Sequence, residues 1–210
     1  RIHFVGNVMI DTLLANRERA VPAAATLSGI SRFSSDVSNF GVLTLHRPSN
    51  VDDPVVLQRL LEALVDLSER VPLVFPIHPR TRARIAETGL SPLLENSRIG
   101  LTEPLGYLQL LGLMSEARLV LTDSGGLQEE TTALGVPCIT LRENTERPIT
   151  VTQGTNTIVG TDVAKIRACF DDVLATGGKA GRVPALWDGR AAERIAVVLS
   201  EWAHSRGRAA

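Results

Sequence analysis

Short apolar segments alternate with amphipathic helical segments along most of this chain, and this alternation restricts the fold more than any other feature. The apolar segments have the length of single buried strands, which we expect at 41–45, 71–77, 98–101, 119–122, 137–141 and 157–159. The helices are expected at 54–69, 80–87, 107–116 and 127–134, and along two apolar stripes beginning at Val163 and Ile195. Strands that alternate with helices form right-handed β-α-β units. The sequence therefore predicts the α/β class, with a mostly parallel sheet covered on both faces.

Composition sets limits on the partners of the chain. It has 210 residues, 22 basic against 23 acidic side chains, and a net charge of −1. Such a balance gives no positive surface for unselective binding to nucleic acid, and no apolar run approaches the length of about 18 residues that a membrane span requires. Cys138 and Cys169 are too few for a disulfide framework or a zinc cluster. We expect a cytoplasmic protein without nucleic-acid partner, membrane insertion, metal or cofactor.

The start of the chain differs from the rest. Residues 17–39 are rich in Ala, Ser and Arg without clear periodicity, and the chain begins at Arg1 without a methionine. These features predict an inter-domain hinge or connector over 1–39, joined to one α/β domain over 40–204 and followed by a frayed tail over 205–210. The alternative is that 17–39 is a surface excursion of the same domain.

Polar loops follow five of the expected strands. In open α/β sheets, ligands bind outside the carboxyl ends of the strands, so these loops mark the candidate site. They are His46-Arg47-Pro48-Ser49-Asn50, His78-Pro79-Arg80, Glu103-Pro104, Asp123-Ser124-Gly125-Gly126 and the stretch from Arg142 to Pro148. Together they predict a cleft at one edge of one sheet.

The loop after the expected strand 119–122 has the strongest signal. Gly125 and Gly126 allow backbone amides to approach an anion, and the helix start adds a partial positive charge. Ser124 can donate to a phosphate oxygen, and Glu130, about one and a half turns further on, can accept both hydroxyls of a ribose. The segment thus predicts a nucleoside diphosphate site, whereas the absence of P-loop and Gly-x-Gly-x-x-Gly motifs disfavours ATP hydrolysis and NAD binding. The alternative makes Ser124 a helix cap and Glu130 part of a solvated face.

Other strand-end residues have two possible roles each. His46 can donate to a phosphate or to a leaving oxygen, or it can be a structural histidine; His78 gives the same signal more weakly. Arg142 and Arg147 can clamp an anion. Alternatively, Arg142 forms an ion pair with Glu146 that only shapes their loop.

The order and spacing of these motifs resemble those of the non-hydrolysing bacterial UDP-N-acetylglucosamine 2-epimerases. The resemblance covers nearly the whole chain. It rests on His46-Arg47, His78-Pro79, Glu103-Pro104-Leu105 with Tyr107, Thr122-Asp123-Ser124-Gly125-Gly126 with Gln128-Glu129-Glu130, Thr145-Glu146-Arg147-Pro148, and the flanking Gly6-Asn7 and Asp188-Gly189-Arg190-Ala191. The Thr145–Pro148 motif favours this family over B-type glycosyltransferases.

This resemblance implies a glycosyltransferase-B type fold with an active site between two Rossmann-like halves. The chain then corresponds to the C-terminal half, with 40–204 as a UDP-sugar-binding domain, and the full-length protein is expected to be a homodimer. The family's reaction inverts carbon 2 of the sugar by anti-elimination of UDP and re-addition, with proton-moving carboxylates in the N-terminal half. In this chain it places His46 near the leaving diphosphate. The substrate-binding candidates are Ser124, Gly125, Gly126, Glu130, Arg142, Glu146, Arg147, Glu103 and Leu110.

The chain departs from the family pattern at two places. Pro48-Ser49-Asn50 stands where some members carry Arg and Glu. Arg47 and His78 match positions that some relatives use for an allosteric substrate molecule, so they are possible regulatory residues. Leu110 stands where relatives often have an aromatic side chain near the uracil.

The expected function is binding of UDP or a UDP-N-acetylhexosamine, with little or no epimerisation by this chain alone, because no unclaimed pair of carboxylates remains in the loops. The alternatives are a non-catalytic nucleotide-sugar-binding module, a B-type glycosyltransferase and a hydrolysing epimerase.

Overall fold

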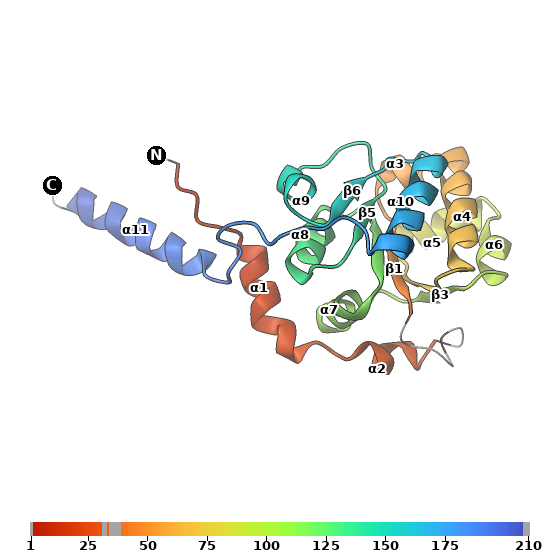
Figure 1. The fold of residues 1–210 in the computed structure, drawn as a ribbon, viewed down its shortest axis with the longest axis horizontal. Coiled ribbons are helices and arrows are strands. Elements are labelled where there is room, and N and C mark those ends of the chain that lie inside the picture. The colour runs from red at the N-terminus through yellow and green to blue at the C-terminus, as the bar shows by residue number, and fades with distance from the viewer. Residues whose placement is uncertain (1, 31–32, 34–38, 208–210) are drawn as a thin grey trace.

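The computed structural model describes residues 2–30, 33 and 39–207, with only the backbone at 206 and 207. Its strands form one fully parallel sheet in the order β3-β2-β1-β4-β5-β6 (Figure 1). They are β1 (Gly41–Thr44), β2 (Leu73–Pro76), β3 (Ile99–Thr102), β4 (Leu119–Thr122), β5 (Cys138–Thr140) and β6 (Asn156–Ile158). The predicted α/β class and parallel sheet are confirmed.

Helices cover both faces of the sheet, because successive strand side chains point to opposite sides. Val42, Val74 and Val120 belong to one buried cluster, whereas their neighbours in sequence belong to the other. The first cluster is covered by α2 (Ala23–Leu27), α7 (Tyr107–Glu116) and α8 (Gly125–Leu134). The second is covered by α4 (Pro54–Ser68), α5 (Pro79–Glu87), α6 (Ser91–Glu95) and α10 (Val163–Thr176).

Helix α4 shows how local sequence builds one of these layers. The Asp53 carboxylate accepts hydrogen bonds from the amides of Val55 and Val56, and Pro54 occupies the first turn. The predicted leucine stripe is fully buried against the sheet; it consists of Leu57, Leu60, Leu61 and Leu64. The helix and its inward face are therefore as the sequence predicts.

The strand order places a switch in chain direction between β1 and β4. The chain leaves β1 toward β2 and β3, then returns to the other side of β1 to form β4. Loops on either side of such a switch point diverge and leave a crevice beyond the carboxyl ends of the two strands. His46 follows β1 and Asp123 follows β4, so both lie at this crevice.

Three short helices within the predicted domain 40–204 are not predicted by the sequence. They are α3 (Pro48–Val51), α6 and α9 (Pro148–Thr152), each with a proline in its first turn. A helix of four or five residues is too short to show a periodic apolar pattern, so only the proline marks its start. Helix α8 also begins at Gly125, two residues before the predicted start.

The first part of the chain contains α1 (Val8–Asn16), a 3₁₀ turn (Arg17–Arg19) and α2. Ala23 and Leu27 of α2 are fully buried in the same cluster as Val42. Part of the stretch read as a connector is thus packed on the sheet domain. The assignment of 1–39 as a hinge stays a prediction, and 31–32 and 34–38 lie outside the described residues.

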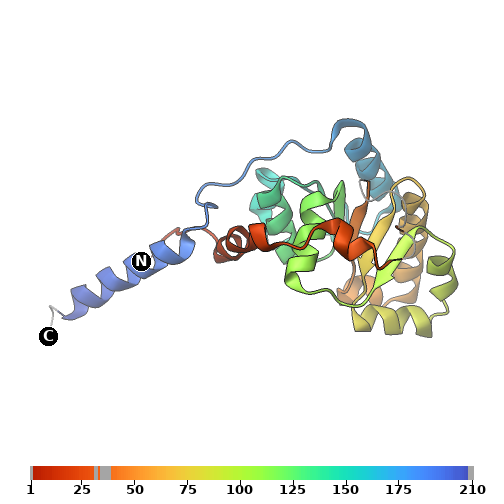
Figure 2. The same ribbon diagram turned by 90° about the horizontal axis from the view of Figure 1, so that it is seen from below.

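Helix α11 (Ala191–Gly207) begins beside α1 and extends away from the sheet domain in both views (Figures 1 and 2). The Asp11 carboxylate of α1 accepts hydrogen bonds from the amides of Ala191 and Ala192, at 3.0 and 2.7 Å. The helix continues into the predicted tail, of which 208–210 lie outside the described residues. Over the part of the chain that the structure describes, no helix is long and apolar enough to cross a bilayer.

Candidate functional site

The crevice between β1 and β4 opens into a cavity of about 230 Å³. Four of the predicted site residues line it: His46, His78, Leu110 and Ser124. They come from the loops after β1 and β2, from α7 and from the start of α8. Pro104, Leu105 and Leu127 supply much of the remaining apolar wall. The structure thus brings together four side chains that the sequence places on four separate segments.

His46 is held by a buried carboxylate that the sequence analysis did not single out. Its Nδ1 lies 2.9 Å from Oδ1 of Asp123. The other oxygen, Oδ2, accepts hydrogen bonds from the amides of His46 and Arg47, at 2.9 and 2.8 Å, and from Nδ2 of Asn50, at 3.2 Å. Asn50 also donates to the carbonyl of Leu141 at 2.8 Å, so the network ties together the ends of β1, β4 and β5.

Asp123 is fully buried yet ionised. Burial opposes the charged form, but hydrogen bonds from the His46 side chain and from the amides of Arg47 and His46 outweigh it and hold the pKa of Asp123 below its ordinary value. A buried charge requires such partners. The site therefore contains a fixed negative charge directly behind the imidazole of His46.

His78 faces His46 across the cavity. The two ring centroids are 6.0 Å apart. His78 is the N-cap of α5, and its Nδ1 accepts the amide hydrogen of Arg80 at 3.2 Å. The two imidazoles thus differ at this ring nitrogen, since Nδ1 of His46 faces a carboxylate oxygen and Nδ1 of His78 accepts an amide hydrogen.

The start of α8 forms the predicted anion-binding element. Ser124 is the N-cap, but its hydroxyl caps no amide of the helix. The alternative reading of this serine as a capping side chain is therefore not what the structure shows. Gly125 and Gly126 form the first turn, where backbone amides have no carbonyl partner within the helix. This turn can bind an anion through its amides and through the free hydroxyl.

Glu130 is buried, with 6% of its surface exposed, so it does not belong to a solvated helix face. The Tyr107 hydroxyl donates to its Oε1 at 3.1 Å. Burial raises the pKa of Glu130, with the Tyr107 hydrogen bond opposing and the Glu129 charge reinforcing the rise. Burial and the Glu130 charge in turn raise the pKa of Tyr107 to about 12. Tyr107 therefore stays protonated and fixes one oxygen of this carboxylate.

Glu129, the preceding residue, has a different role. Its Oε1 accepts from Nδ2 of Asn7 at 2.9 Å, and its Oε2 lies 3.0 Å from Nε of Arg147. This carboxylate joins the N-terminal segment, α8 and the start of α9. Arg147, predicted to contact substrate, is engaged in this structural ion pair.

Arg142 and Glu146 form the ion pair that the sequence analysis considered as an alternative. The guanidinium contacts both carboxylate oxygens, at 2.9 and 2.7 Å. This contact lowers the pKa of Glu146 to about 2. The loop lies against the start of α8, because a Cβ added at Gly125 would meet Oε2 of Glu146 at 3.7 Å. The pair therefore borders the first turn of α8.

Glu103 is not among the residues that line the cavity. Its side chain is 79% exposed and pairs with Arg82 at 2.7 Å.

Arg47 is, with His78, one of the two possible regulatory residues. It is the N-cap of α3, and its backbone amide donates to Asp123. Its Nε is buried without a hydrogen-bond partner in the described part of the chain.

The roles of Asp123, Asn50 and Tyr107 are not predicted from the sequence. Asp123 could have been found, because an acidic residue directly after a buried strand and before a glycine pair sits under the anion-binding turn. Asn50 and Tyr107 carry no comparable signal. Their partners are 73 and 23 residues away in sequence, and only the fold brings them together.

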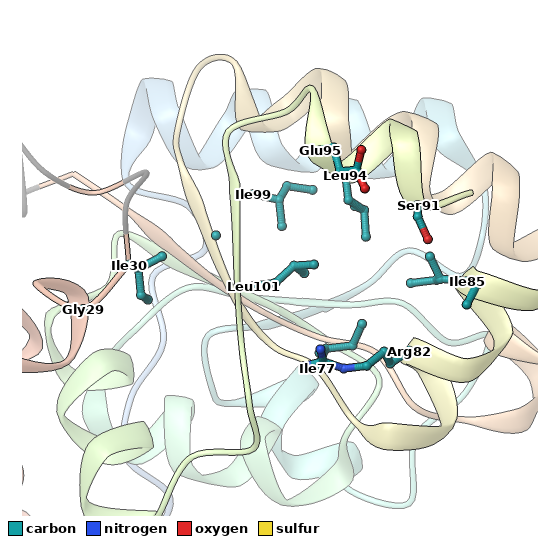
Figure 3. A pocket seen from close by; sticks show the side chains of 12 residues that line it. Gly29, Ile30, Ile77, Arg82, Ile85, Ser91, Leu94, Glu95, Ile99 and Leu101 are labelled. Carbon is teal, nitrogen blue, oxygen red and sulfur yellow. The ribbon is translucent and has the colours of Figure 1, made fainter. Parts of the chain in front are cut away.

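A second cavity lies at the edge of the sheet, between β3, α5 and α6, and holds none of the predicted site residues (Figure 3). It measures about 420 Å³ and is lined mainly by aliphatic side chains such as Ile77, Ile85 and Leu94. Among the described residues, no group of three His, Cys, Asp or Glu side chains could hold a metal ion.

Comparisons with known proteins identify relatives of this chain. A relative from Methanococcus maripaludis, a UDP-N-acetylglucosamine 2-epimerase, is 42% identical over 177 residues, which cover 83% of this chain and 48% of the relative. A UDP-2,3-diacetamido-2,3-dideoxy-D-glucuronate 2-epimerase from Pseudomonas aeruginosa is 43% identical over 157 residues, covering 74% of this chain and 41% of the relative. The chain spans about half the length of the relatives it matches.

Solved structures extend the likeness to three dimensions. The UDP-GlcNAc 2-epimerase of Methanocaldococcus jannaschii, in complex with UDP-GlcNAc and UDP, superposes with a TM-score of 0.83 at 37% identity over 95% of this chain and 55% of that chain. This agrees with a Rossmann-like lobe of the glycosyltransferase-B type. The sequence model of UDP-N-acetylglucosamine 2-epimerases matches residues 1–200, and together with the identity to the relatives above this match shows that the chain belongs to that family.

Proposed function

We propose that this chain binds UDP and UDP-N-acetylhexosamines in the crevice between β1 and β4. The observation that carries the proposal is the first turn of α8. There Ser124 lines the cavity, Gly125 and Gly126 form the helix turn that follows it, and Glu130 lies further along the same helix. This order of groups suits a diphosphate followed by a ribose.

The apolar wall of the cavity supplies the third part of a nucleotide site. Leu105, Leu110 and Leu127 line it, and a base can be held by aliphatic side chains through burial of its faces. We assign the uracil to this wall, the diphosphate to the start of α8 and the ribose to Glu130. Leu110 gives contact area without aromatic stacking.

More observations support the assignment of the uridine diphosphate part of the ligand than support the choice of sugar. Two relatives of nearly equal identity, 42% and 43%, are named for different 2-acetamido sugars. Both names share the UDP group, and the described groups of the crevice suit this shared group. A UDP-N-acetylhexosamine is therefore the proposed ligand class.

For the family reaction, inversion at carbon 2 requires removal of the C2 proton, cleavage of the C1–O bond to UDP and formation of the C1=C2 double bond. UDP then adds back to C1 as C2 takes a proton on the opposite face. A positioned base and acid are needed for both steps. His46, beside the proposed diphosphate position, is suited to act near the leaving oxygen.

The carboxylates around the crevice are already engaged. Asp123 holds His46, Glu129 pairs with Arg147, Glu130 accepts from Tyr107 and Glu146 pairs with Arg142. We therefore propose that this chain is the UDP-binding part of a non-hydrolysing epimerase and has little or no epimerase activity alone. A non-catalytic binding module remains the alternative function.

Calorimetric titration with UDP, UDP-GlcNAc, ADP and GDP tests the binding proposal. We expect saturable binding of the two uridine ligands and much weaker binding of the purine nucleotides. Equal binding of all four, or no binding of UDP, would contradict the proposal.

Product analysis by proton NMR tests the proposal about catalysis. After incubation with UDP-GlcNAc, we expect unchanged substrate. Formation of UDP-ManNAc would show that the chain is active alone, and free sugar would show a hydrolysing enzyme.

A further inference from the structure

The contact between His46 and Asp123 restricts where the imidazole can carry its proton. Asp123 is ionised and acceptor-only, and its four contacts are with two backbone amides, the Asn50 amide and Nδ1 of His46. A bare ring nitrogen 2.9 Å from an ionised carboxylate oxygen would be repelled by it, so Nδ1 carries a hydrogen and the two side chains attract each other electrostatically. A neutral His46 therefore has its hydrogen on Nδ1 and a bare lone pair on Nε2.

This tautomer is unsuited to an anion. A lone pair on Nε2 repels a phosphate oxygen, whereas a protonated Nε2 donates to it and adds a positive charge. The imidazolium also gains from the fixed charge of Asp123 behind it. We propose that binding of a nucleotide diphosphate in this crevice causes Nε2 of His46 to take up one proton; this proposal rests on the proposed function. Asp123 is the positioning residue that couples the proton uptake to the binding.

The other charged groups around His46 do not replace it in this role. Neutral His78 already has its hydrogen on Nε2, because its Nδ1 accepts from the Arg80 amide, so it can donate to a phosphate without taking up a proton. Arg47 is permanently charged, and Arg142 and Glu146 are paired with each other. His46 is thus the group in the crevice whose hydrogen-bonding capacity must change when an anion arrives.

Calorimetry in buffers of different ionisation enthalpy measures the proton uptake directly. UDP-GlcNAc is the suitable probe, because its diphosphate is a diester whose charge does not change near neutral pH. At about pH 8, above the ordinary imidazole range, we expect uptake of about one proton per ligand and an affinity that falls up to tenfold per pH unit. Tight binding at this pH without proton uptake would overturn the proposal.

Asp123→Asn separates the positioning role from a merely structural one. The new amide can donate to Nδ1, so His46 can shift its hydrogen to Nε2 and donate while neutral. We expect the proton uptake of D123N at about pH 8 to fall toward zero and the pH dependence to flatten. Unchanged uptake in a folded D123N would contradict the assignment.

His78→Asn is the matched control, since asparagine can also cap α5. H78N should keep the full proton uptake, whatever its affinity. Loss of uptake in H78N, with retention in D123N, would assign the coupling to His78 instead.

Nitrogen-15 NMR of the imidazoles tests the tautomer without any ligand. We expect His46 of the wild-type chain, assigned by its loss in His46→Gln, to carry its neutral hydrogen on Nδ1; a hydrogen on Nε2 would refute the role of Asp123. This readout needs no folded D123N. If UDP-GlcNAc does not bind at any pH, the proposed function fails, while the tautomer still decides the role of Asp123.

Discussion

At the scale of single residues, Glu129 and Glu130 are adjacent carboxylates on α8 with separate tasks. Replacing Glu130 with alanine removes the proposed acceptor for the ribose hydroxyls. Hydrogen bonds to charged groups contribute about 1.5–3 kcal/mol, so we expect E130A to weaken UDP binding by about 10- to 100-fold. Calorimetry with UDP measures this loss directly.

Glu129→Ala is the matched comparison. It leaves Arg147 without its carboxylate and Asn7 without its acceptor, so it should lower the free energy of unfolding by about 1–3 kcal/mol. Its UDP affinity should fall much less than that of E130A. Equal losses of affinity in the two variants would argue against a ribose contact at Glu130.

The ion pair of Glu146 should make the stability of its loop depend on pH. Its pKa is about 2, against 4.5 for an unpaired glutamate. A depressed folded-state pKa contributes stability that is fully present above 4.5 and is lost as the pH falls toward about 2. The contribution is small because the Glu146 side chain is 54% exposed.

NMR titration of the Glu146 carboxyl carbon should therefore show ionisation well below the ordinary glutamate range. In Arg142→Gln the titration should return toward the ordinary range. A Glu146 that titrates normally in the wild-type chain would mean that the ion pair does not persist in solution.

At the scale of elements, Gly112 decides how α7 meets the segment before α2. A Cβ at this position would lie 1.8 Å from the carbonyl oxygen of Val21, whose amide donates to the Leu108 carbonyl. In a helix without such a neighbour, Gly→Ala stabilises by about 1 kcal/mol. Here the clash requires the backbone to move, so we expect G112A to destabilise by about 1–3 kcal/mol.

Urea denaturation measures this change. Gly29→Ala serves as the control, because among the described residues its added Cβ would meet only a carbonyl oxygen of Thr26, at 3.9 Å. G29A should leave the unfolding midpoint nearly unchanged. A G112A variant that is more stable than wild type would show that the segment at Val21 does not pack against α7 as described.

At the scale of the whole molecule, residues near the two ends of the chain are in contact with each other. Besides the Asp11 contacts with α11, Gly6 has a φ of +104° and lies so close to the Leu186 carbonyl that a Cβ would be 2.3 Å from that oxygen. Arg194 also donates to the carbonyl of Val5 at 3.3 Å. These contacts join segments about 180 residues apart in sequence.

Asp11→Ala removes the carboxylate that caps α11. Loss of an N-terminal cap destabilises a helix by about 0.5–2 kcal/mol, so amide hydrogens of α11 should exchange about 2- to 30-fold faster in D11A. Strands β1 and β4 should keep their protection. The measurement is hydrogen exchange followed by mass spectrometry.

Asp162→Ala is the corresponding change at α10, where Asp162 caps the helix through the amides of Ala164 and Lys165. It should speed exchange in α10 and leave α11 unaffected. Loss of protection across the entire sheet in D11A would mean that α1 stabilises the domain as a whole, instead of holding α11.

The sequence by itself determined the α/β class, the strand positions and the loops that carry the site. These features follow from local patterns. Short apolar runs indicate buried strands, and a leucine stripe behind a capping residue indicates α4. Two glycines after β4 indicate a turn that can bind an anion. The short helices α3, α6 and α9 escaped prediction because four or five residues hold too little periodicity.

Only the tertiary structure decided which polar side chains are paired with each other. Arg142 and Glu146 were foreseen as a possible pair because they are close in sequence. Asp123 behind His46 joins the ends of two neighbouring strands that are distant in sequence. Such pairings depend on strand order, and strand order is fixed by how the helices bury both faces of the sheet, a property of the whole chain that no local pattern contains.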